Sequence, residues 1–217
     1  MGYKLVLFDL DGTLLDTLDD LSEAVNQALQ TRGLPLHTRD EYMSMVGHGI
    51  RNLVKQALPA EKQEDEALID SALADFKAYY TAHIDKHTRP YPGMQQLLRQ
   101  LSENGVQMAV ISNKFQEGTD YLIRKFFPEI PFVVVLGNRP GFPLKPDPEI
   151  VHEVLRKAGL AQEDALMVGD SQTDMKTAKN GGIRAIAVSW GYRSMKGTPG
   201  LTVADSAKEI LEEVLER

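Results

Sequence analysis

Apolar residues gather in short runs that alternate with helical patterns along most of the chain. The runs are nearly continuous and rich in branched side chains, as in strands that are buried on both faces of a sheet. We predict strands at residues 3–8, 106–111, 132–136, 165–168 and 184–188, and helices at residues 93–103, 116–127, 148–158, 174–179 and 207–216. This alternation is typical of an α/β fold, with a Rossmann-like parallel sheet and helices on both faces.

One long segment, residues 15–89, has no convincing strand pattern. Its apolar residues recur three and four positions apart, which predicts amphipathic helices. Turns that contain glycine or proline separate these helices, for example at residues 32–35 and 47–49. We therefore predict an all-helical domain, residues 15–89, inserted into an α/β core domain made of residues 1–14 and 90–217.

Length and composition narrow the class of protein. The 217 residues suffice for one hydrophobic core with a smaller insertion. The formal net charge of −7 provides no basic surface for nucleic acids or anionic membranes, so we expect neither as a partner. The chain has no cysteine, which excludes disulfides, cysteine nucleophiles and thiolate metal sites. Because no apolar segment suits a signal peptide or a bilayer span, we expect a cytoplasmic protein, monomeric or homodimeric.

Polar residues follow the ends of several predicted strands. The carboxyl ends of parallel strands meet at one edge of a sheet, where ligands bind. A lysine also precedes the helix predicted at 148–158. The segments that we expect at this edge are Asp9-Leu10-Asp11-Gly12-Thr13, Ser112-Asn113-Lys114, Gly169-Asp170 with the nearby Asp174, and Leu144-Lys145-Pro146.

Asp9 and Asp11 form an unusual pair directly after a buried strand. Side chains two positions apart in an extended chain point the same way, so both carboxylates can face one reacting group. Two such acids repel each other, and burial of either without a partner is costly, so local folding gives no reason for the pair. One acid can attack while the other handles protons. Together with the other segments, the pair favours a catalytic site over an Asx-type turn.

These four motifs, in this order, resemble those of the haloacid dehalogenase superfamily of phosphohydrolases, and the resemblance spans the whole chain. The helical insertion between the first two motifs resembles the small cap domain of the phosphoglycolate phosphatase-like branch, which is also similar to β-phosphoglucomutase and phosphonoacetaldehyde hydrolase. The resemblance implies hydrolysis of a small phosphorylated metabolite through an aspartyl phosphate, with Mg²⁺ as the cofactor.

The resemblance also implies a role for each residue at the sheet edge. Asp9 would be the nucleophile, and Asp11 would protonate the leaving oxygen and then deprotonate water. Lys145 would neutralise charge on the phosphoryl group, as this reaction requires. The remaining implied roles are phosphate binding by Ser112 and the Asn113 backbone amide, Mg²⁺ binding by Asp9, Asp170 and the Asp11 backbone carbonyl, support of the metal shell by Asp174, and a hydrogen bond from Thr13 near the first acid.

Within the helical segment, we single out His48 and Arg51 as candidates for substrate contact. His48 lies between two glycines, in a turn that can approach the sheet edge, and Arg51 follows closely. Lys55 lies one turn from Arg51, as expected for a surface partner on the same helix. His83 and His87 have the i, i+4 spacing of some metal ligands, but with no evident third ligand we interpret them as part of a solvated helix face.

Several other functions fit the same chemistry. A phosphomutase would use Arg51 and Lys55 to grip a second phosphate. A phosphonate hydrolase would need a Schiff-base lysine, for which Lys55 is a candidate. Pyrophosphate is a further possible substrate. A phospho-acceptor signalling module or a noncatalytic binding protein is disfavoured, because the paired acid, the insertion, Lys145 and Asp170 are all present.

Overall fold

The computed structural model describes residues 2–216, and a six-stranded sheet forms its centre. All neighbouring strands pair in parallel, which confirms the predicted parallel α/β core. The order across the sheet is β5 (Phe132–Asn138), β4 (Gln107–Phe115), β1 (Leu5–Phe8), β6 (Ala165–Gly169), β7 (Arg184–Val188) and β8 (Thr202–Ala204). The edge strand β8 was not predicted, because its three residues lack a recognisable apolar run.

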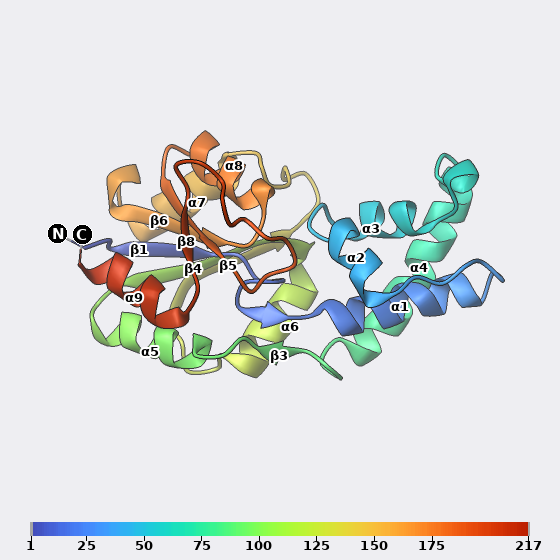
Figure 1. Cartoon of the computed structure of the whole chain (residues 1–217), viewed down its shortest axis with the longest axis horizontal. Coiled ribbons are helices and arrows are strands. Elements are labelled where there is room, and N and C mark those ends of the chain that lie inside the picture. Colours follow the sequence, from blue (N-terminus) through green and yellow to red (C-terminus); the bar gives the residue numbers. More distant parts are fainter. Residues whose placement is uncertain (1, 217) are drawn as a thin grey trace.

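Helices cover both faces of this sheet, with α5, α6 and α9 on one side and α7 and α8 on the other (Figure 1). The strand β1 is buried on both faces: Val6 and Phe8 join the core cluster that contains α5, α6 and α9, whereas Leu5 and Leu7 join the cluster that contains α7 and α8. The bounds of these helices are Met94–Glu103 for α5, Gln116–Phe126 for α6, Glu149–Ala158 for α7, Gln172–Asn180 for α8 and Ala207–Leu215 for α9.

Residues 17–88, which we call the helical insertion, lie at the end of the molecule opposite to both chain termini (Figure 1). Within this range the structure has helices and connecting turns but no strand. The helices are α1 (Leu18–Gln30), α2 (Arg39–Met45), α3 (Ile50–Ala57), α4 (Glu66–His83) and a 3₁₀ turn at Ala60–Lys62. Long aromatic side chains fill its interior, and Tyr42, Phe76 and Tyr80 are fully buried.

A two-stranded antiparallel ladder joins the insertion to the sheet domain. It pairs β2 (Leu15–Asp16) with β3 (Arg89–Pro90). The sequence analysis expected only helices from residue 15 to residue 89, so these two strands correct that prediction at its two ends. Where the chain enters and leaves the insertion side by side, pairing satisfies backbone groups that a helix end leaves open.

No helix among residues 2–216 is long and apolar enough to cross a membrane.

Candidate active site

Asp9, Lys145 and Asp174 form a buried charge cluster at the carboxyl end of β1. The Lys145 Nζ donates hydrogen bonds to Asp9 Oδ1 and to Asp174 Oδ1, both at 2.7 Å, and to the Ile111 carbonyl at 3.1 Å. Burial alone lowers the pKa of Lys145, but Asp174 and Asp9 outweigh this effect and raise it. Lys145 is therefore a cation at neutral pH, in contact with the predicted nucleophile.

Asp174 is fixed by the start of α8 as well as by Lys145. Its Oδ2 accepts hydrogen bonds from the Ser171 backbone N–H at 3.1 Å and from the Ser171 hydroxyl at 2.6 Å. The Ser171 hydroxyl in turn caps α8, by accepting from the Asp174 backbone N–H. Because both carboxylate oxygens of Asp174 have hydrogen-bond partners, its side chain has a fixed orientation and holds Lys145 in place.

Asp170 follows β6 directly and adds a third buried carboxylate. Its Oδ2 accepts a hydrogen bond from the Tyr192 backbone N–H at 2.8 Å. The backbone of Gly12 packs closely against this carboxylate. Gly12 has φ of 89°, and a Cβ added to it would lie 2.4 Å from Asp170 Oδ2. Burial and then the Asp174 carboxylate raise the pKa of Asp170 to about 7. Burial and the same neighbour raise the pKa of Asp9 well above its usual range.

Asp11 lies at the same edge but has different partners. Its Oδ1 accepts a hydrogen bond from the Thr17 hydroxyl at 2.6 Å and from Lys114 Nζ at 3.1 Å. Lys114 Nζ also donates to the Tyr80 hydroxyl at 2.6 Å. Thus two residues of the helical insertion, Thr17 and Tyr80, are connected to the second acid of the pair.

Ser112 and Asn113 are buried in the last part of β4, where its register with β5 is interrupted. The Ser112 hydroxyl accepts a hydrogen bond from the Lys114 backbone N–H at 3.1 Å, which leaves its own proton free for a ligand. The Asn113 side chain bonds to the backbone of Lys145 twice: its Oδ1 accepts from the Lys145 N–H at 2.8 Å, and its Nδ2 donates to the Lys145 carbonyl at 3.1 Å. Asn113 Nδ2 also donates to the Gly47 carbonyl, at 3.0 Å, and so reaches the insertion.

Thr13 does not make the predicted hydrogen bond near the first acid. Its hydroxyl is buried and has no hydrogen-bond partner among residues 2–216. The Thr13 carbonyl instead accepts from Trp190 Nε1 at 3.2 Å. The threonine that does contact an acid of the pair is Thr17, four residues farther along the chain.

A pocket lies between this edge and the helical insertion. Its volume is about 50 Å³, above the roughly 10–15 Å³ that a cavity needs to hold a water molecule. Asp9, Asp11 and Asp170 line it from the sheet side. The insertion supplies a mostly apolar wall that is made of Leu21, Val46, Gly47, Gly49, Ile50 and Leu53.

The two substrate-contact candidates in the insertion do not line this pocket. Arg51 is 46% exposed and pairs with Glu66 and Asp70 of α4, away from the pocket, so its contact with the substrate stays a prediction without support from this structure. His48 is exposed and lies outside the pocket lining, and partial desolvation lowers its pKa, with Arg193 and Lys176 adding to the effect. Lys55 pairs with Glu64 at 2.9 Å, as expected for a surface residue.

The donor set at the sheet edge fits a divalent metal ion. Carboxylate oxygens of Asp9, Asp170 and Asp174 lie within 4.8 Å of one another, and Lys145 is the only lysine or arginine bonded to them among the described residues. Asp9 Oδ2 and Asp170 Oδ1 accept no hydrogen bond from any described residue. Excess buried negative charge with free, hard oxygen donors suits Mg²⁺.

The chain also matches a known protein family. A family model described as haloacid dehalogenase-like hydrolase matches residues 6–188. The chain belongs to the haloacid dehalogenase-like hydrolase family. This membership confirms the predicted resemblance and the prediction of an enzyme of the hydrolase class.

Two relatives of this hydrolase are named phosphoglycolate phosphatase. One, from Mesorhizobium japonicum, is 36% identical over 193 residues, which cover 88% of this chain and 85% of the relative. Phosphoglycolate phosphatase 1 from Pseudomonas aeruginosa is 34% identical over 213 residues, with coverage of 96% and 78%. A crystal structure from Lactobacillus delbrueckii subsp. bulgaricus, assigned as a phosphoglycolate phosphatase, superposes with a TM-score of 0.92, at 31% identity and full coverage of both chains.

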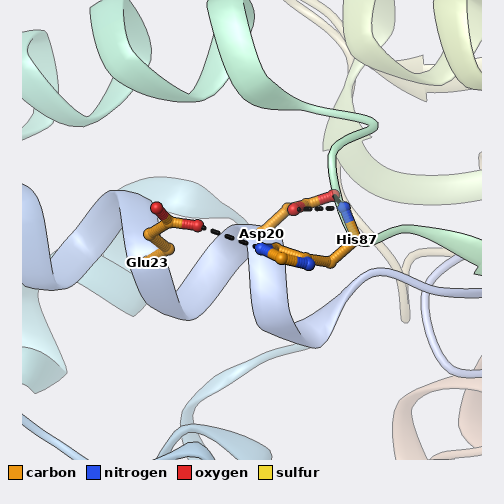
Figure 2. Close-up of side chains that lie close together, drawn as sticks. All are labelled: Asp20, Glu23 and His87. Carbon is orange, nitrogen blue, oxygen red and sulfur yellow. Dashed lines mark hydrogen bonds and ion pairs between the residues drawn. The ribbon is translucent and has the colours of Figure 1, made fainter.

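The hydrolase has a second group of metal-ligand side chains in the insertion, made of Asp20, Glu23 and His87 (Figure 2). The sequence analysis noted His87 but found no third ligand, because its neighbours come from α1, more than sixty residues away. Asp20 accepts hydrogen bonds from the backbone N–H groups of His87 and Thr88 and from the Thr88 hydroxyl, at 2.7 to 3.1 Å. These bonds occupy both of its oxygens, so this group ties α1 to the chain that leaves the insertion.

Sequence reasoning assigned no role to four residues of this site: Thr17, Lys114, Tyr192 and Arg193. Of the four, Lys114 was the easiest to predict from the sequence, because it directly follows Ser112 and Asn113. Tyr192 and Arg193 come from the loop after β7, which has no polar strand-end motif. Arg193 donates to the carbonyls of Ser44 and Val46, both at 2.8 Å, and so joins this loop to the insertion.

Proposed function

We propose that this hydrolase cleaves small phosphate monoesters through phosphorylation of Asp9, with Mg²⁺ as cofactor and phosphoglycolate as the first candidate substrate. One observation carries the proposal: Asp9, Asp11 and Lys145 line the same pocket, with the carboxylate of Asp9 in contact with a buried ammonium. The names of the two curated relatives support the choice of substrate.

In the first step, a carboxylate oxygen of Asp9 attacks the phosphorus atom. The bond from phosphorus to the ester oxygen breaks, and its electron pair stays on that oxygen, which takes a proton from the Asp11 carboxyl. The products are the alcohol and phosphorylated Asp9. Lys145 and the Ser112 hydroxyl stabilise the negative charge on the phosphoryl oxygens.

In the second step, the Asp11 carboxylate accepts a proton from water as the water oxygen attacks phosphorus. The bond from phosphorus to Asp9 breaks, its electron pair returns to the carboxylate, and inorganic phosphate leaves. Asp9, Asp170 and the Asp11 backbone carbonyl would hold Mg²⁺, with Asp174 supporting them. When bound, the ion supplies positive charge against the carboxylates and the phosphoryl oxygens.

The size of the pocket favours a small substrate. The pocket volume is only about 50 Å³, which suits a small phosphorylated metabolite. The apolar wall from the insertion excludes bulk water from the reacting groups, which strengthens their electrostatic interactions. A small pocket walled by the insertion favours a small metabolite over a phosphoprotein.

The alternative functions that rest on Arg51 and Lys55 gain no support. Arg51 is held by two acids of α4, and Lys55 pairs with Glu64 on the surface. Neither residue lines the pocket, so neither is available there to grip a second phosphate or to form a Schiff base with a substrate.

Phosphate release from a panel of esters tests the proposal. The panel contains phosphoglycolate, hexose phosphates and pyrophosphate, each assayed with Mg²⁺ and with EDTA. We expect release that depends on Mg²⁺ and is fastest with phosphoglycolate. Silence across the panel with folded, Mg²⁺-loaded protein would contradict the proposal, and phosphoryl transfer between hexose phosphates without release would indicate a mutase instead.

A further inference from the structure

We infer that Lys114 is a positioning residue for Asp11. It holds the Asp11 carboxyl so that one oxygen, Oδ2, carries the proton that is given to the leaving group, and through Tyr80 it ties this arrangement to α4 of the insertion. The inference rests on the proposed function, because it concerns the acid and base of that reaction.

Lys114 is a buried cation to which the two steps above give no role. Its side chain comes from β4, and the residue is only 4% exposed. Its Nζ donates to Asp11 Oδ1 at 3.1 Å and to the Tyr80 hydroxyl at 2.6 Å, and lies 4.7 Å from the centroid of the Tyr80 ring. A lysine so buried requires partners for its charge, and Asp11 is its only carboxylate partner among residues 2–216.

The two oxygens of Asp11 have different environments. Oδ1 accepts hydrogen bonds from both Lys114 and Thr17, whereas Oδ2 accepts none from any described residue. A proton on the Asp11 carboxyl therefore lies on Oδ2, since an oxygen that accepts from an ammonium and a hydroxyl is a poor site for it. The ammonium of Lys114 also stabilises the carboxylate that remains after the proton has moved to the leaving oxygen.

Thr17 completes the arrangement from the start of the insertion. Its single hydroxyl proton goes to Asp11, so the Tyr192 hydroxyl, 3.1 Å from Thr17 Oγ1, must donate to it. The Tyr192 hydroxyl also accepts from the Thr17 backbone N–H at 2.8 Å. The hydroxyl of Thr17 is thereby oriented toward Asp11 Oδ1.

Both partners that link Asp11 to the insertion depend on how the insertion sits on the sheet. Tyr80 is fully buried in α4, and Thr17 immediately precedes α1. A shift of these helices away from β4 breaks the bond between Lys114 and Tyr80. Asp11 is thus held for proton transfer only when the insertion is seated as in this structure.

Leaving-group dependence provides the test. Phosphoglycolate and ethyl phosphate release alkoxides, which need a proton, whereas acetyl phosphate releases acetate, which does not. Single-turnover rates of phosphoryl transfer from all three are compared for wild type, Lys114→Met and Tyr80→Phe. We expect Lys114→Met to slow transfer from both alkyl esters about 100-fold, as for loss of general-acid catalysis, and transfer from acetyl phosphate only a few-fold. Tyr80→Phe should show the same selectivity to a smaller extent.

Lys55→Met is the matched control, because it removes a half-buried surface lysine of the insertion that lies outside the pocket lining, and all three rates should stay unchanged. An equal loss with all three substrates would overturn the inference in favour of a purely structural role. A rise in KM confined to phosphoglycolate would overturn it in favour of direct binding of the substrate carboxylate. If Lys114→Met does not fold, Tyr80→Phe decides, and an unchanged rate ratio contradicts the inference. Absence of wild-type turnover on every ester would instead refute the proposed function, and the inference with it.

Discussion

Among the described residues of this hydrolase, two groups of three side chains could hold a metal ion, and they differ in the partners that their polar atoms have. Asp9, Asp170 and Asp174 at the sheet edge are three buried acids; Asp9 and Asp174 share the Lys145 ammonium, and Asp9 and Asp170 each keep a free carboxylate oxygen. In the insertion, the Asp20 carboxylate accepts from backbone N–H groups and the Thr88 hydroxyl, and Glu23 accepts from Lys86. His87 contacts both acids of this group (Figure 2). Ligand type and proximity therefore do not distinguish a reactive site from a structural one, whereas unpaired donor atoms and unbalanced charge do.

The largest expected effect is a loss of activity when the sheet-edge group is changed. Asp9→Asn keeps the shape of the side chain and removes the nucleophile, so turnover should fall by about 10⁴-fold or more. Folding should be unaffected, because the change relieves repulsion among buried acids. Steady-state kinetics and thermal unfolding of the same preparation measure both. Activity within tenfold of wild type would rule out Asp9 as the nucleophile.

Asp20→Ala should lower stability rather than activity. It leaves the buried donors of His87 and Thr88 without an acceptor, which should lower the free energy of unfolding by about 3 kcal/mol. For a chain of this size, that loss corresponds to roughly 6–12 °C in Tm. The control is Asp19→Ala, on the same helix as Asp20. It removes an exposed ion-pair partner of Arg39 and should lower the free energy of unfolding by less than about 1 kcal/mol. Equal losses in the two variants would contradict the structural role of Asp20.

Mg²⁺ should stabilise the protein through the sheet-edge group alone. A ligand at 100 times its Kd adds about 2.7 kcal/mol to the free energy of unfolding. Thermal unfolding with and without Mg²⁺ should show this shift for wild type and for Glu23→Gln, but not for Asp170→Asn. Loss of the shift in Glu23→Gln, with retention in Asp170→Asn, would place the ion in the insertion.

A further expected effect is a pH dependence of the metal-free protein. The pKa of Asp170 is about 7 in the folded chain against 3.8 normally, so the native state binds more protons than the unfolded state between these values. The contribution of Asp170 to the free energy of unfolding is therefore greatest at low pH and decreases as pH rises from about 4 to about 7. Urea unfolding in EDTA should show a shallower decline for Asp170→Asn than for wild type. Identical slopes would show that Asp170 titrates normally.

Much of the sheet edge could be predicted, because strand ends and motif order are local properties of the sequence. Asp9, Lys145, Asp170 and Asp174 lie together in the structure as that reasoning expected. Their assigned roles in catalysis and metal binding remain predictions.

The contacts of the insertion could not be predicted in the same way. The position of Arg51 depends on two acids of α4 that both bind its guanidinium group. The partner of Lys114 depends on which face of α4 packs against β4. The three-residue strand β8 and the ladder of β2 with β3 are too short for any periodicity, and only tertiary contacts define them.

Direct identification of a phosphorylated Asp9 tests the central claim. The enzyme is mixed with Mg²⁺ and phosphoglycolate, quenched in acid during turnover, and treated with borohydride, which reduces an aspartyl phosphate to homoserine. Mass spectrometry of the peptides then locates the modified residue. We predict homoserine at position 9 in wild type and none in Asp9→Asn. Turnover without modification at position 9, or with modification at another aspartate, would contradict the account.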